Sequence, residues 1–102
     1  MKVLTVIIHT NIQQQLSDLL HKLQPVSGFT FAQVEGHGLE VETDPFVSAH
    51  DDAVGYVPRV RTDILLKDED VEDVLTILRS KEAELKGKSF YWVSRADQGG
   101  QL

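Results

Sequence analysis

A nearly continuous apolar segment close to the N-terminus, residues 2–9 (KVLTVIIH), limits the possible folds more than any other part of the chain. It is rich in β-branched residues, which favour the extended conformation of a strand. A strand with apolar side chains on both of its faces has to be covered on both faces. The segment therefore predicts a buried strand in a layered structure.

Two segments with helical periodicity follow. After the first strand, Thr10 stands three residues before Gln13, which is the spacing of a capping box, and apolar residues at helical period continue to about Gln24. Pro25 then predicts the end of this helix. The segment 67–85 opens with acidic residues, which suit the positive end of a helix, and carries an apolar stripe.

Three further strands complete the order β-α-β-β-α-β. They are expected at residues 29–35, ending at Gly36, at residues 57–66 and at residues 89–94. This order is that of the ferredoxin-like split βαβ motif, an α+β fold with a four-stranded antiparallel sheet and two helices on one face. The 102 residues suit one domain, residues 1–102, with a polar tail at 95–102.

Two helices cover only one face of such a sheet, so apolar residues on the other face need another cover. We expect self-association to provide it, with Tyr91 and Trp92 in the core and the subunit interface. The alternative is that these residues are only modestly exposed, as many apolar residues are in folded proteins.

The charge and the residue types exclude several classes of function. A net charge of −6 argues against binding to nucleic acid or to anionic lipid. The N-terminal apolar run is too short for a membrane span or a signal peptide, so we expect a cytoplasmic protein without direct membrane insertion. No nucleophile stands beside a plausible base, and we do not expect an enzyme.

The long acidic segment 37–56 is the first candidate for function, because loops of more than about 12–15 residues are uncommon in small domains. Since the chain has no cysteine, any metal would need His and carboxylate ligands. Such ligands suit Zn²⁺, Ni²⁺, Co²⁺ or Cu²⁺. The alternative is a solvated acidic loop in which the two histidines are incidental. The candidate metal ligands are His37, Glu40, His50, Asp51 and Asp52.

Three stretches in fixed order, FTFAQVEGHG, YVPRVRTDILLKDEDVEDVLTIL and LKGKSFYWV, resemble the PII signal-transduction superfamily over about residues 2–94. The resemblance implies a homotrimer whose sheets pack around a central axis, with residues 37–56 as its long T-loop. It also implies that an adenine nucleotide or another anionic ligand binds between subunits. The residues that match this cleft by position and type are Gly36, Gly38, Arg59, Arg61, Gly87 and Lys88.

The chain departs from the usual PII pattern at three places. Leu39 and Glu40 stand where the family has Arg-Gln, the tail lacks the C-terminal arginines, and Tyr56 lies at the end of the loop. In its short, His-containing and arginine-poor form, the chain resembles a divergent branch of the superfamily that is associated with heavy-metal efflux pumps. That branch implies a regulatory protein that senses a divalent metal, or a small anion, and signals through its loop to a membrane transporter. The alternatives are a nucleotide sensor that uses the cleft and a passive metal-binding trimer.

Overall fold

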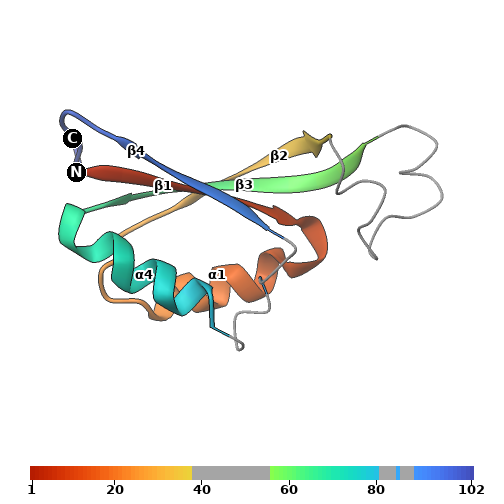
Figure 1. Cartoon of the computed structure of the whole chain (residues 1–102), viewed down its shortest axis with the longest axis horizontal. Coiled ribbons are helices and arrows are strands. Elements are labelled where there is room, and N and C mark those ends of the chain that lie inside the picture. The colour runs from red at the N-terminus through yellow and green to blue at the C-terminus, as the bar shows by residue number, and fades with distance from the viewer. Residues whose placement is uncertain (38–55, 81–84, 86–88) are drawn as a thin grey trace.

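Four strands form an antiparallel sheet in the order β2-β3-β1-β4, and two helices lie together against one of its faces (Figure 1). The computed structural model describes residues 1–37, 56–80, 85 and 89–102. This arrangement confirms the predicted α+β, ferredoxin-like fold. The elements are β1 (Lys2–His9), η1 (Thr10–Ile12), α1 (Gln13–Lys22), β2 (Thr30–Gly36), β3 (Val57–Leu66), η2 (Asp68–Asp70), α4 (Val71–Leu78) and β4 (Phe90–Arg95).

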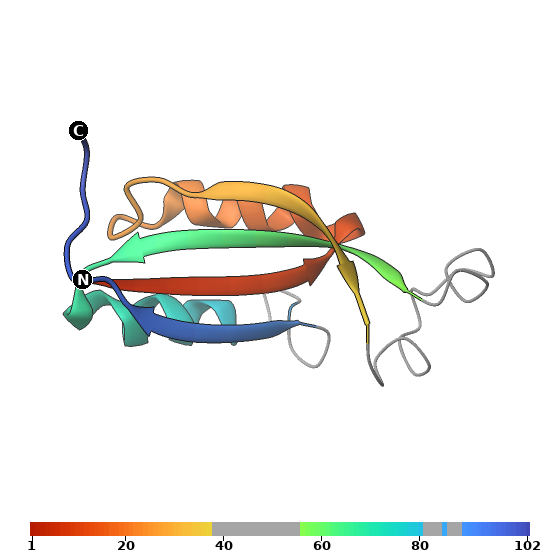
Figure 2. The same ribbon diagram turned by 90° about the horizontal axis from the view of Figure 1, so that it is seen from above.

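Strands β1 and β3 occupy the centre of the sheet, and β2 and β4 form its edges (Figure 2). The central pair is in register from Lys2 opposite Leu66 to His9 opposite Arg59. Strand β4 pairs with β1 from Lys2 opposite Arg95 to Ile7 opposite Phe90. Since side chains alternate along a strand, these pairings fix which residues share a face.

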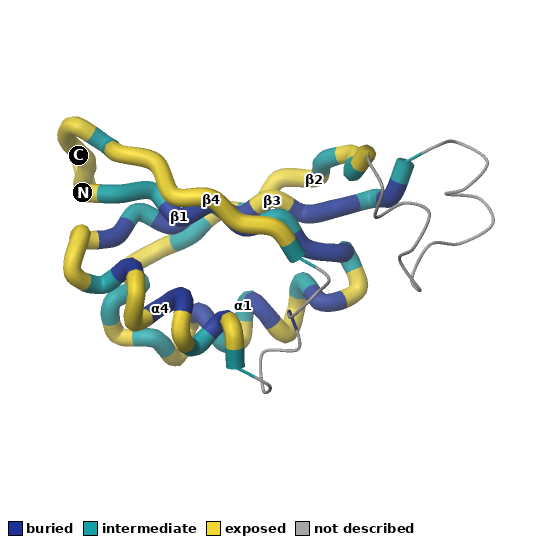
Figure 3. Tube along the Cα trace, viewed as in Figure 1, coloured by how far each residue is buried: buried dark blue, intermediate teal, exposed yellow. Residues whose placement is uncertain are grey.

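The hydrophobic core lies between the sheet and the two helices. Leu4, Val6 and Ile8 of β1 point toward the helices and are buried. Figure 3 shows the burial concentrated in β1, in β3 and on the facing sides of the helices, whereas β4 is exposed along its length. The helices contribute the apolar positions expected from their periodicity, namely Ile12, Leu16, Leu20, Val71, Val74, Leu75 and Leu78.

The beginning of the first helical region differs from the predicted capping box. The side chain of His9 caps the turn, because its Nδ1 accepts a hydrogen bond from the backbone N–H of Asn11 at 3.2 Å. Thr10 is instead the first residue of the 3₁₀ turn η1. The prediction placed the cap one residue too late, because an imidazole nitrogen can accept the same kind of hydrogen bond as a hydroxyl oxygen.

Both helices end earlier than predicted. Leu23 is extended, with φ −89° and ψ 116°, so α1 ends at Lys22, ahead of Pro25. Helix α4 ends at Leu78 instead of near residue 85. There the hydroxyl of Ser80 donates a hydrogen bond to the carbonyl of Ile77 at 2.6 Å. This bond satisfies a carbonyl that would accept from a backbone N–H if the helix continued.

The polar tail folds back against the end of the sheet. The N–H of Ala96 donates a hydrogen bond to the carbonyl of Met1 at 3.1 Å. Farther along, Gly99 packs so closely on Leu65 that an added Cβ would lie 2.8 Å from its Cδ2 atom. The tail therefore passes from the end of β4 across β1 to β3 (Figure 2).

Two adjacent leucines on α1 test the placement of the core. Leu20 is fully buried and Leu19 is only partly buried, although both pack on the core. We expect Leu20→Ala to lower the free energy of unfolding by about 2–5 kcal/mol, because it leaves a cavity. Leu19→Ala, the control, has the same change in helix propensity and is expected to cost clearly less. Equal losses in urea denaturation would contradict this placement of α1.

Candidate functional site

The face of the sheet that points away from the helices, called here the open face, carries a shallow groove of about 510 Å³. The groove brings together residues from β1, β2, β3 and β4. Three of the residues predicted from the sequence, Gly36, His37 and Arg61, lie on it. The remaining lining residues include Ile7, Val34, Glu35, Phe90 and Trp92.

Two aromatic side chains form the apolar part of the groove. Phe90 and Trp92 alternate with Tyr91 on β4 and are 50% and 45% exposed. The expectation that Tyr91 and Trp92 lie in the core is therefore wrong for a single chain. Trp92 is on the face that points away from the helices, and Tyr91, on the helix side of the edge strand, is still 49% exposed. Their predicted place in a subunit interface stays a prediction.

Arg61 connects the aromatic part of the groove to a chain of polar contacts. Its guanidinium carbon lies 5.6 Å from the centre of the Trp92 ring, within the range of a cation–π interaction. Its Nε donates to Asp63 Oδ2 at 3.1 Å, and the Thr5 hydroxyl donates to Asp63 Oδ1 at 2.6 Å. These contacts hold the guanidinium beside the ring, and the Arg61 side chain remains 44% exposed.

The Asp63 carboxylate is stabilised in its charged form. Partial burial alone would raise its pKa, but the hydrogen bond from Thr5 and the hydrogen bonds and charge of Arg61 outweigh burial and lower the pKa below 3.8. Asp63 therefore remains negative at neutral pH and offsets part of the charge of Arg61. An anion that binds Arg61 has to share the guanidinium with this carboxylate.

Arg59, the other predicted cation of β3, differs from Arg61 in its environment. It is only 1% exposed, and its side chain lies against the backbone of Gly36. A Cβ added at Gly36 would lie 2.7 Å from Arg59 Cγ and 3.2 Å from the carbonyl oxygen of Val57. Gly36, which was predicted to let a ligand approach the backbone, thus also makes room for the buried side chain of Arg59.

His37 stands at the end of β2, beside the groove. Its Nε2 lies 3.3 Å from Glu35 Oε2, and its ring centre lies 5.9 Å from that of Tyr56. Within the described ranges, no group of three or more His, Asp and Glu residues could hold a metal ion. The other predicted site residues, Gly38, Glu40, His50, Asp51, Asp52, Gly87 and Lys88, lie outside the described residues.

The sequence analysis missed Thr5, Asp63 and Phe90 as members of the site. Alternation along residues 89–94 already places Phe90 and Trp92 on the same face, so that signal was present in the sequence. The pairing of Thr5 with Asp63 depends on the register of two strands distant in sequence, which no local pattern reveals.

Comparison with known proteins assigns the family. Residues 1–102 match the family described as "Protein of unknown function (DUF3240)". The chain belongs to the DUF3240 family. It is also similar to the crystal structure of a DUF3240 family protein from Shewanella baltica OS155 at 2.40 Å resolution, with a TM-score of 0.76 and 22% sequence identity over 99% of this chain and 94% of that chain. No curated protein matches the chain.

The solved DUF3240 structure supports the fold of this chain, and at this identity it supports the fold alone. Among the described residues of this DUF3240 protein, no helix is long and apolar enough to cross a membrane.

A pair of glycines tests the close approach at β2. Gly36→Ala forces its new methyl group against Arg59 and a backbone carbonyl, and is expected to lower the free energy of unfolding by about 1–3 kcal/mol. Gly28→Ala is the control, because nothing lies within 4 Å of its added Cβ. That variant is expected to be neutral or about 0.4–1 kcal/mol more stable. Equal stability of both variants in urea denaturation would contradict the packing of Arg59 on Gly36.

The lowered pKa of Asp63 predicts a pH-dependent contribution to stability. The contribution is present above the unfolded-state pKa of 3.8 and is lost as pH falls through the lower folded-state pKa. Asp63→Asn is therefore expected to be less stable than the wild type near neutral pH. The difference in the free energy of unfolding should shrink as the pH falls below the pKa of the carboxyl in the unfolded chain. Denaturation at a series of pH values measures it, with Asp97→Asn in the exposed tail as control. A difference that is independent of pH would refute this role of the carboxylate.

Proposed function

We propose that this DUF3240 protein is a PII-like regulatory protein, a homotrimer that binds a divalent heavy metal or a small anion at its open face. In this proposal, segment 37–56 carries the signal to a membrane efflux transporter. The observation that carries the proposal is the meeting of His37, Glu35 and Arg61 on one groove, beside two half-exposed aromatic rings. Such a groove offers part of a ligand site and part of an interface in each chain.

The exposed aromatic residues support self-association. Phe90 and Trp92 project from an edge strand on a face that the helices do not cover. Clustered apolar side chains on a surface commonly mark sites of protein contact, and closed symmetric assembly is the most frequent way for identical chains to bury them. A second copy over this face would also narrow the open groove and supply further ligand groups.

The His37–Glu35 pair supports metal binding. Imidazole nitrogen and carboxylate oxygen are the ligand atoms that Zn²⁺, Ni²⁺, Co²⁺ and Cu²⁺ accept when thiolates are absent. The two atoms lie 3.3 Å apart, which is close to the separation of two ligand atoms that bind one tetrahedral ion with bonds of about 2.0–2.1 Å. A complete coordination sphere needs further ligands, which segment 37–56 or a neighbouring subunit would supply.

A second candidate, an adenine nucleotide, is favoured by the contact of Arg61 with Trp92. The guanidinium could pair with a phosphate group, and the half-exposed rings of Phe90 and Trp92 could stack on a base. The carboxylate of Asp63 weakens this candidate, because it already occupies part of the guanidinium. We therefore rank the metal ahead of the nucleotide.

Calorimetric titration tests the choice of ligand. Metal-free protein is titrated with Zn²⁺, Cu²⁺, Ni²⁺ and Co²⁺, and separately with ATP. We expect at least one metal to bind, and His37→Ala to weaken it about tenfold or more through loss of a ligand. His21→Ala is the matched control, because His21 is an exposed histidine on α1 whose Nδ1 contacts the Ser17 carbonyl at 2.8 Å.

The outcomes of these titrations separate the two candidates. Metal binding that is equal in both histidine variants would remove His37 from the site. Binding of ATP that is lost in Arg61→Gln, without any metal binding, would replace the metal sensor by a nucleotide sensor.

A further inference from the structure

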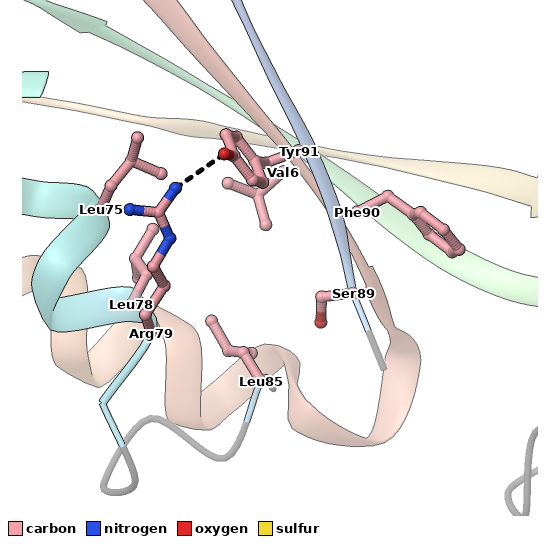
Figure 4. A pocket seen from close by; sticks show the side chains of 8 residues that line it. All are labelled: Val6, Leu75, Leu78, Arg79, Leu85, Ser89, Phe90 and Tyr91. Carbon is pink, nitrogen blue, oxygen red and sulfur yellow. Dashed lines mark hydrogen bonds between the residues drawn. The ribbon is translucent and has the colours of Figure 1, made fainter. Parts of the chain in front are cut away.

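A second cavity lies on the opposite side of β4 from the open groove, between that strand and α4. Its volume is about 370 Å³, which is within the range of small-molecule sites. Figure 4 shows α4 on one side of it, β4 on the other and Leu85 at its lower end. Among the residues that the structure describes, none of those predicted from the sequence as ligands lines this cavity.

The interior of the cavity is apolar. Val6 from β1, Leu75 and Leu78 from α4, and Leu85 border it, and all four are buried residues of the core. These side chains offer no hydrogen bonds to water inside the cavity. An apolar group that entered would therefore exchange poorly bound water for dispersion contacts, which favours binding.

Arg79 provides a positive charge at the rim. Its Nη2 donates a hydrogen bond to the Tyr91 hydroxyl at 2.7 Å, and its guanidinium carbon lies 5.3 Å from the centre of that ring (Figure 4). The carboxylate of Glu72 is 3.9 Å away, and its side chain is largely in solvent. The Tyr91 hydroxyl does not offset the charge of Arg79, and Glu72 forms only a long, solvent-exposed ion pair with it. The guanidinium therefore retains N–H donors and positive charge with which to bind an anion.

Ser89 adds an independent indication of a polar ligand group. Its Oγ is buried, and within the described part of the chain it has no hydrogen-bond partner. Buried hydroxyl groups are nearly always hydrogen-bonded, because leaving one unpaired costs free energy. Ser89 lines the cavity from the β4 side, facing the space that Arg79 borders from α4 (Figure 4).

We propose that this cavity binds a small amphiphilic carboxylate, with its apolar body between α4 and β4 and its carboxylate group on Arg79. The Ser89 hydroxyl donates to an oxygen atom of the bound molecule. The chemistry follows from Arg79, the one charged group among the described residues that line the cavity, beside an apolar interior. This combination selects an anion with a hydrocarbon or aromatic body. The cavity shares Phe90 and Tyr91 with the open groove, but the proposed binding needs no metal.

The test uses octanoate as the probe and 1-octanol as its neutral counterpart, each titrated into the full chain. Methyl NMR resonances report where each molecule binds. We expect octanoate to shift the resonances of Leu75, Leu78 and Leu85 with saturation, and octanol to bind more weakly. Arg79→Gln should weaken octanoate about tenfold or more, and Ser89→Ala by about two- to tenfold.

Arg95→Gln is the control, because it removes an exposed arginine at the far end of β4 that lines neither this cavity nor the open groove. It should leave octanoate binding unchanged. The amide spectra of the variants confirm that each is folded. The proposal is overturned if octanoate causes no saturable shift of the cavity methyl groups, or binds equally to Arg79→Gln. It is also overturned if octanol binds as tightly as octanoate, or if the shifts fall on Ile7 and Val34 of the open face.

Discussion

The two faces of the central strands have different covers, and the rest of the structure depends on this difference. Leu4, Val6 and Ile8 commit one face of β1 to the helices, so alternation sends Thr5 and Ile7 to the other. The register of β3 with β1 fixes, by the same alternation, which side chains of β3 lie on each face. Helices α1 and α4 both pack against the first face, so neither covers the other. Whatever lies on the open face must be made soluble by its own polar groups, covered by the chain's own tail, as Leu65 is by Gly99, or covered by another molecule.

The structure shows the first solution on part of the open face. Toward its middle, the hydroxyl of Thr5 and the guanidinium of Arg61 satisfy the Asp63 carboxylate, which makes that part compatible with water. Toward the β4 edge, Phe90 and Trp92 stay half exposed, and the guanidinium of Arg61 lies over the Trp92 ring. Strand β4 also separates the two cavities, because its alternate side, with Tyr91, faces α4 and Arg79. One edge strand thus borders both the open groove and the apolar cavity.

Much of this architecture was predictable, because apolar periodicity reports which side of an element is buried. The bounds of β1 and β3 agree with those expected from the sequence, and the apolar stripe of α4 is confirmed. Helix ends were harder to predict, since they depend on single hydrogen bonds such as those made by His9 and Ser80. For the site, the resemblance to the PII superfamily selected Gly36 and Arg61, which do lie on one groove. It could not select Asp63, whose role arises from strand register, or the cavity beside Arg79, which arises from the packing of α4 on β4.

We propose that further copies of the chain cover the open face in a homotrimer. Sedimentation velocity of the wild type and of Trp92→Lys tests it most directly, because a lysine on the exposed edge strand is compatible with a folded monomer but not with a buried interface. We expect the wild type to sediment with three times the chain mass of 11.4 kDa at micromolar concentration, and the variant to shift toward the mass of a single chain. A wild type that sediments as a single chain at every concentration would contradict it, as would a variant that assembles like the wild type.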